Sequence, residues 1–231
     1  IAVLRSRAEP LGICLHMAEP DALAYDDPDA FGVLLQTPDR DGAVHDLSGC
    51  IDKAHGNDLL VAVAADLLCC TLFIPPGEYG ADVVLGNSQR FGVPLGCGGP
   101  HAAFFATSDG LTREMPGRII GVSVDSEGGL AYRMALQTRE QHIRREKAKS
   151  NICTAQALLA NMAGFYAMYH GPEGLKNIAQ RIHTFASAIS AAGQAMGIPQ
   201  LNETFFDTLC FDAGMSSRAI RTEAEKAGYN F

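Results

Sequence analysis

The stretch that decides the fold runs from Ala81 to His101 and reads ADVVLGNSQRFGVPLGCGGPH. Its first five residues form a short apolar run of the kind that fills a buried strand. The sixteen residues from Gly86 to His101 contain five glycines and two prolines, so the backbone must turn tightly there or let another group approach closely. A strand that leads into a polar, glycine-rich loop is typical of α/β enzymes that hold a cofactor at the carboxyl edge of a sheet.

Short apolar runs on either side of this stretch indicate further strands, and longer periodic segments indicate helices. We expect strands at Leu11–Met17, Phe31–Gln36, Leu59–Ala65, Asp82–Leu85, Ala102–Ala106, Arg118–Val124 and Phe205–Asp212. We expect helical segments at Asp46–Ala54, Leu67–Phe73, Gln137–Lys147, Thr154–Tyr169 and Gly174–Ala192. The segment from Thr154 to Tyr169 is apolar all round and should be a buried helix that ends at His170-Gly171-Pro172. Alternating strands and helices favour parallel pairing covered on both faces.

The composition narrows the class of protein. Hydrophobic residues make up 47% of the 231 residues and charged residues 19%, as in an ordinary globular protein with a sizeable core. The net charge of −8 argues against nucleic-acid or membrane-surface binding, which require clustered basic residues. The seven cysteines are odd in number and form no CxxC pair, so we expect reduced thiols and no metal site.

Three groups of residues could bind a ligand, and each has an ordinary structural reading as well. Asp66, at the end of a predicted strand, could hydrogen-bond a protonated heterocyclic nitrogen, or it could form a turn. The glycines in Gly96–His101 could cradle a phosphate or simply turn the chain. Ser150, Asn151 and Thr154 follow a basic segment and could form an anion site at a helix start. That basic segment, Arg133–Lys149, could equally be a solvated polar helix.

Three longer stretches together closely resemble the glycine-cleavage P-protein family, the decarboxylating glycine dehydrogenases. They read GADVVLGNSQRFGVPLGCGGPHAAFF, MPGRIIGVSVD and RMALQTREQHIRREKAKSNICTAQALLANMAGFYAMYHGPEGL, and the resemblance runs from about Gly32 to Asp212. It implies an α/β fold of type I among pyridoxal-phosphate-dependent transferases, like aspartate aminotransferase. We therefore expect the large domain at residues 1–198, with a mostly parallel sheet between helices, and the start of a small domain at 199–231. We expect both domains to be truncated.

A protein of this family looks like two homologous halves, and this chain resembles the amino-terminal half. The resemblance places Gln89 where the other half has its catalytic lysine, and Ser88 where that half has the preceding histidine. An amide cannot form a Schiff base, so we expect no catalytic residue in this half. The residues implied to lie at the cofactor are Asp66, Ser88, Gln89, Ser150, Asn151 and Thr154. Arg144 or Arg145 should face the partner half beside them.

For the whole enzyme, the resemblance implies a reaction of glycine with lipoylated H-protein that gives aminomethylated H-protein and carbon dioxide. Pyridoxal 5'-phosphate would be held mainly by the other half, and this fragment alone would be inactive. The implied partners are the carboxy-terminal half or a second P-protein subunit, in a dimer, and the lipoylated H-protein. The implied compartment is a bacterial cytoplasm or a mitochondrial matrix, not the secretory route.

Three alternatives remain open. The chain could be an assembly half without a cofactor of its own. It could be an unrelated fold-type-I enzyme, which would need a lysine after the strand that ends at Gly86. It could also be an α/β domain that binds another phosphate ligand.

Overall fold

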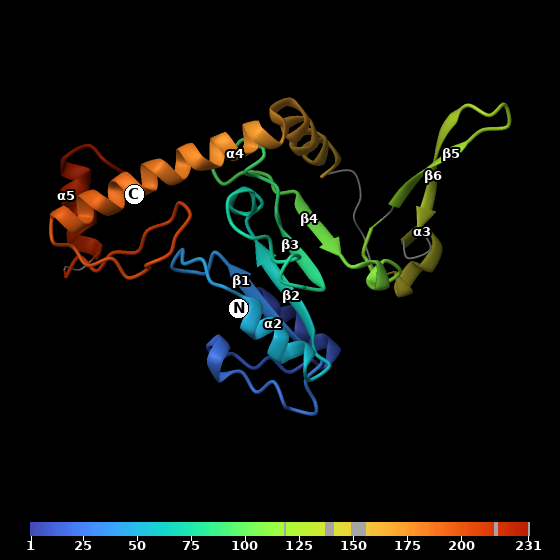
Figure 1. The fold of residues 1–231 in the computed structure, drawn as a ribbon, viewed down its shortest axis with the longest axis horizontal. Helices are drawn as coiled ribbons and strands as arrows, with labels where there is room; N and C mark the ends of the chain where they lie inside the picture. Colours follow the sequence, from blue (N-terminus) through green and yellow to red (C-terminus); the bar gives the residue numbers. More distant parts are fainter. Residues whose placement is uncertain (118, 137–140, 149–155, 215–216, 231) are drawn as a thin grey trace.

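The fold is built around a four-stranded sheet, seen in a computed structural model that describes residues 1–117, 119–136, 141–148, 156–214 and 217–230 (Figure 1). The strand order is β1-β2-β3-β4. Strands β1 (Gly32–Thr37), β2 (Leu60–Ala65) and β3 (Val83–Asn87) are parallel, and β4 (Ala103–Thr107) is antiparallel to β3. The prediction of a mostly parallel α/β sheet is therefore confirmed.

One face of the sheet packs on helix α2 (Ser48–His55). Asp46 precedes this helix, and its Oδ1 accepts the N–H of Ser48, the first residue of α2, at 2.9 Å. Buried side chains of α2, β1 and β2 then share one core, whose members are Tyr25, Leu35, Leu47, Ile51, Ala54, Leu59, Val61 and Val63. On the other face Leu34 and Leu60 are about half exposed, so the expected cover on both faces is not found within the described residues.

A second core, here called the edge cluster, lies at the carboxyl end of the sheet. Two of its members are Leu68 and Cys69, at the start of the 3₁₀ turn η3 (Cys69–Thr71). The others are Ala179 of the long helix α4 and Phe206 of the segment that follows α4. All four residues are buried. The edge cluster therefore fixes the segment that follows α4 against the edge of the sheet where β2 ends.

Helix α4 (Ala157–Ala195) carries a kink at Gly171, whose φ of 62° and ψ of 179° are not helical, directly before Pro172. The predicted break is thus confirmed as a kink, with the helix continuing beyond it. The prediction of a buried helix before the break is wrong, because Phe165, Met168 and Tyr169 are 68–86% exposed. After the kink, Ile178 and Ile182 pack against the edge cluster, and the buried residues of the helix are small, namely Ala179, Ala186, Ser190 and Gly193.

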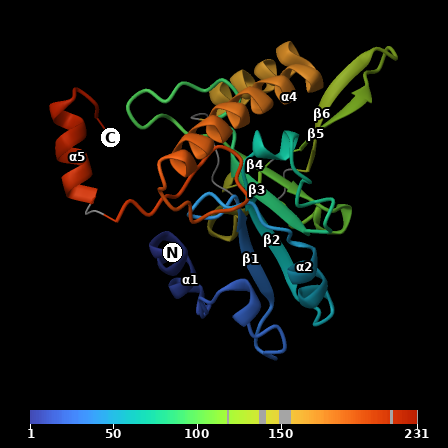
Figure 2. The same cartoon turned by 60° about the vertical axis from the view of Figure 1, so that its left-hand side comes forward.

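Strands β5 (Ile119–Val124) and β6 (Leu130–Leu136) form a separate antiparallel hairpin that projects away from the sheet (Figures 1 and 2). The remaining helices are short. They are α1 (Ala2–Ala8), η1 (Glu9–Leu11), η2 (Pro20–Ala22), η4 (Asp109–Leu111), α3 (Gln141–Arg144), η5 (Arg145–Lys147) and α5 (Ser217–Lys226). In both views α5 lies away from the sheet. Within the described residues, no helix combines the length and apolarity that crossing a membrane requires.

Two predicted strands are wrong. Leu11–Met17 forms no strand, and its large apolar side chains are exposed because no neighbouring strand pairs with it. Phe205–Asp212 makes only two isolated bridges, Ala43 with Phe205 and Gln200 with Phe211. Its alternating pattern instead places Phe206 in the edge cluster and Asp207 beside the sheet.

Candidate functional site

Asp66 stands where β2 ends, and all of its carboxylate contacts are local or ionic. Its Oδ1 accepts the N–H groups of Leu68 at 2.8 Å and Cys69 at 3.2 Å, so the side chain begins the turn η3. Its Oδ2 lies 3.1 Å from Nη1 of Arg90, in the loop after β3. Asp66 is the carboxylate that we expected at the cofactor. Both of its oxygens therefore have partners within the chain itself.

The glycine-rich loop after β3 is held by its own polar groups. Asn87 Oδ1 accepts the N–H of Gln89 at 2.8 Å, and the Asn87 amide also meets the ring of His101. Buried Ser88 donates both its N–H and its hydroxyl to the carbonyl of Ala102, at 2.8 and 2.9 Å. The Gln89 amide donates to the carbonyl of Pro100 at 3.4 Å. The loop is thus folded back onto the start of β4.

Arg90 connects this edge of the sheet to the segment that follows α4. Its Nη2 lies 2.6 Å from Oδ2 of Asp207, and its guanidinium lies 5.4 Å from the ring centroid of buried Phe206. His183 Nδ1 and the carbonyl of Phe206 are 2.7 Å apart, which ties the same segment to α4. One guanidinium therefore bridges two carboxylates from segments more than a hundred residues apart.

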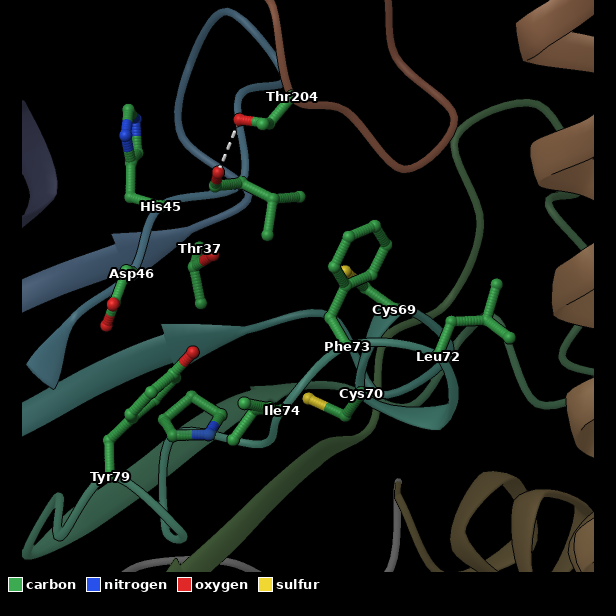
Figure 3. A pocket seen from close by; sticks show the side chains of 12 residues that line it. Thr37, His45, Asp46, Cys69, Cys70, Leu72, Phe73, Ile74, Tyr79 and Thr204 are labelled. Atoms are coloured by element: carbon green, nitrogen blue, oxygen red, sulfur yellow. Dashed lines mark hydrogen bonds between the residues drawn. The ribbon is translucent and has the colours of Figure 1, made fainter.

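A pocket of about 310 Å³ opens beside this site at the ends of β1 and β2 (Figure 3). It is lined by Thr37, Val44, His45, Asp46, Cys69, Cys70, Leu72, Phe73, Ile74, Pro76, Tyr79 and Thr204. The Thr204 hydroxyl donates to the Val44 carbonyl at 2.6 Å across its rim. Thr37 Oγ1 is buried here without a hydrogen-bond partner among the described atoms.

The titratable groups of the pocket are not poised for nucleophilic chemistry. Burial, with the nearby Asp66 charge, raises the pKa of the Cys69 thiol to about 12 and that of Cys70 to about 11. Both thiols are therefore protonated at neutral pH and unreactive. Burial opposes ionisation of Asp39, but hydrogen bonds from His45 and from the Ala43 and Asp41 N–H groups still lower its pKa. His45 Nε2 lies 2.8 Å from that carboxylate.

The structure brings three of the predicted site residues to one edge: Asp66, Ser88 and Gln89. Ser150, Asn151 and Thr154 lie outside the described residues, so their place stays a prediction. Arg144 and Arg145 stand at the junction of α3 and η5. Whether any of these residues contacts a cofactor also stays a prediction.

Sequence reasoning missed the ion pair of Arg90 with Asp207 and the neighbouring pocket. Arg90 stands next to Gln89 in a loop that the sequence singles out, so its position was available. Its partner Asp207 lies in a segment predicted as a strand, and no sequence spacing links the two residues. The pocket arises from four separate stretches of chain, at 37, 44–46, 69–79 and 204, which no local pattern joins.

The fold and its edge site define the class: this is the α/β large-domain architecture of the fold-type-I pyridoxal-phosphate enzymes. A subgroup IV aspartate aminotransferase from Thermus thermophilus has a similar structure, with a TM-score of 0.64. The match covers 97% of this chain and 62% of that one at 15% identity, so it supports the fold alone.

The chain belongs to the glycine cleavage system P-protein family, whose model matches residues 1–231. It is 58% identical over 230 residues to a protein named glycine dehydrogenase (decarboxylating) 2 of Pseudomonas putida. A solved glycine decarboxylase (P-protein) of the glycine cleavage system, in inhibitor-bound form, superposes with a TM-score of 0.91 at 35% identity. That match covers 99% of this chain and 54% of the solved one. The chain spans about a quarter of the length of its curated relatives.

The family implies pyridoxal phosphate, but the residues at this edge do not fit that group. Covalent attachment needs an amine, and the loop after β3 offers the Gln89 amide instead. The pyridine ring needs a free carboxylate, and Asp66 is already paired with Arg90. This edge therefore offers neither an amine at position 89 nor a carboxylate at position 66 that is free of an internal ion pair.

Proposed function

We propose that this chain is part of a decarboxylating glycine dehydrogenase and belongs to its amino-terminal half, which lacks the Schiff-base lysine. The observation that carries the proposal is the family match along the whole chain, combined with Gln89 at the end of β3. The full enzyme would convert glycine and lipoylated H-protein to aminomethylated H-protein and carbon dioxide. Its pyridoxal phosphate would be held mainly by the other half, and this half would support that site from outside.

A partner half is also supported by the hairpin β5–β6. Its cross-strand pairs Ile120–Met134, Val122–Tyr132 and Val124–Leu130 place six large apolar side chains on one face. These side chains are 43–71% exposed, and an isolated two-stranded hairpin is only marginally stable in water. A contiguous exposed apolar patch of this kind marks a protein interface. We assign its cover to the rest of the P-protein polypeptide, because the curated relatives are about four times as long.

The alternative is an assembly half that contributes nothing to the partner's cofactor site. The Asp66–Arg90 pair is compatible with both versions, since it concerns the sheet edge of this chain and not the partner's cofactor. The two versions differ in whether Ser150, Asn151 and Thr154 reach the partner's cofactor. In either version we propose a large domain at residues 1–198, a small domain that begins at 199–231, and a bacterial cytoplasmic or mitochondrial matrix location.

The main test maps the cofactor in the full-length protein. Borohydride reduction fixes a lysine-bound cofactor as phosphopyridoxyl-lysine, and mass spectrometry of the peptides then locates it. We expect the label on one lysine outside residues 1–231. A stoichiometric label on any lysine of this chain, namely Lys53, Lys147, Lys149, Lys176 or Lys226, would overturn the proposal.

A further inference from the structure

The side chain of Arg90 forms the centre of a three-residue ion cluster at the edge of the sheet. Its two terminal nitrogens lie 3.1 Å from Asp66 Oδ2 and 2.6 Å from Asp207 Oδ2. All three side chains are at most 34% exposed, so water screens the cluster only in part. A guanidinium presents several donors in a planar fork, which lets one arginine contact two carboxylates at once.

Both carboxylate oxygens of Asp66 already have partners within the chain. Oδ1 accepts two backbone N–H groups of the turn η3, and Oδ2 pairs with Arg90. A pyridinium ring needs this type of carboxylate both as hydrogen-bond acceptor and as counter-ion. A ring placed there would meet the like charge of Arg90 in a partly buried site, where such repulsion is strong.

Arg90 cannot leave Asp66 without losing further contacts. Asp207 holds its other nitrogen, and the Phe206 ring lies beneath the guanidinium. The segment that carries both residues is fastened in turn by Thr204, which bonds Val44, and by the contact between His183 and the Phe206 carbonyl. The segment from Thr204 to Asp207 therefore keeps the side chain of Arg90 directed at Asp66.

From this arrangement we propose that Arg90 is the specificity-determining residue that excludes the pyridoxal ring from this half. The inference rests on the proposed function and deepens it. Gln89 removes the covalent bond, and Arg90 separately removes the counter-ion that the ring nitrogen requires. Restoring the lysine alone would then not restore cofactor binding.

The test uses pyridoxal phosphate as the probe and the full-length protein with the variants Gln89→Lys, Gln89→Lys/Arg90→Met and Gln89→Lys/Asp207→Asn. Borohydride labelling at position 89 is quantified against cofactor concentration. We expect little label with Gln89→Lys alone and at least tenfold more when Arg90→Met is added. The Asp207→Asn combination removes one charge of the cluster but keeps a side-chain oxygen that accepts from Arg90, so Arg90 should stay on Asp66 and the variant should remain unlabelled.

Each outcome decides the matter. Equal labelling of Gln89→Lys and its Arg90→Met combination overturns the role of Arg90, and so does a folded double variant without label. Arg90→Gln, which removes the charge and keeps hydrogen bonding, replaces Arg90→Met if thermal unfolding shows that the latter is not folded. Label on this chain in the unmutated protein would overturn the proposed function instead, so the two failures are distinguishable.

Discussion

Gly86 allows β3 to approach its neighbours more closely than any side chain permits. A Cβ at this position would collide with the carbonyl oxygen of Ala65 and with the ring of Phe104. We predict that Gly86→Ala lowers the free energy of unfolding by about 1–3 kcal/mol, the usual cost of overpacking. Thermal unfolding measures the effect. Gly110→Ala is the matched control, because its new Cβ would have no neighbour within 4 Å, and equal losses in both variants would contradict the steric explanation.

Asp82 makes the junction between β2 and β3 sensitive to acid. Burial opposes its ionisation, but hydrogen bonds from the Val61 N–H at 2.7 Å and from His55 at 3.0 Å lower its pKa below the ordinary value. A carboxylate with a lowered pKa stabilises the fold above its unfolded pKa, about 3.9, and this contribution disappears as pH falls through the folded value.

We therefore expect the amides of β2 and β3 to lose protection from hydrogen exchange below about pH 4, after correction for the intrinsic rates. Asp82→Asn should reduce protection at neutral pH, since it removes the charge from the bonds to Val61 and His55. It should also flatten the acid dependence at these amides. An acid loss of the same size in the variant would show that Asp82 is not its source.

At the scale of single residues, the sequence predicted the positions of the edge site but not its ion pairs. Asp66 and Gln89 stand at strand ends, which apolar runs and glycines locate well. The contact of Arg90 with Asp207 depends on how the end of the chain packs. Such long-range pairing has no local signal, because it follows from the burial of Phe206 in the edge cluster.

The hairpin β5–β6 exposes six large apolar side chains on one face, so we expect a partner to cover that face. We predict that Val122→Asp in the full-length protein raises hydrogen exchange of the hairpin amides at least tenfold. The new carboxylate would be buried without a counter-ion, which is energetically costly, so the apolar face of the hairpin would separate from the surface that covers it. Ser123→Asp is the matched control, since its side chain lies on the opposite face of the same strand. Equal effects of the two variants would argue against an apolar interface.

Among the elements, strands of the parallel sheet were predicted well and the burial of helix α4 was not. In the apolar run Leu59–Ala65, alternate residues are buried, and Leu59, Val61 and Val63 share a core with α2, so the local pattern is enough to locate the strand. In α4 the apolar residues Phe165, Phe185 and Ile189 are exposed, while Ala179 and Ala186 pack inside. Close packing of a helix against a sheet edge selects small residues, and hydrophobicity alone does not show this selection.

At the scale of the whole molecule, the exposed apolar surfaces and the altered site support one arrangement. The first half of α4 and one face of the hairpin both expose large apolar side chains. The edge of the sheet, by contrast, is closed by Arg90. The edge of the sheet is occupied by Arg90, and the apolar faces are exposed. We therefore propose that this chain acts through contact with the other half.

Under the proposed function, Thr154 is expected to reach the cofactor held by the other half. We predict that Thr154→Ala in the full-length enzyme weakens retention of pyridoxal phosphate about tenfold, because one hydrogen bond to a charged group contributes about 1.5 kcal/mol. Cofactor release during dialysis, followed by absorbance, measures the effect. Thr184→Ala is the control, since the Thr184 hydroxyl bonds only the Gln180 carbonyl of its own helix at 2.8 Å. Unchanged retention in Thr154→Ala would favour the assembly role, because the segment before α4 would then not reach the partner's cofactor.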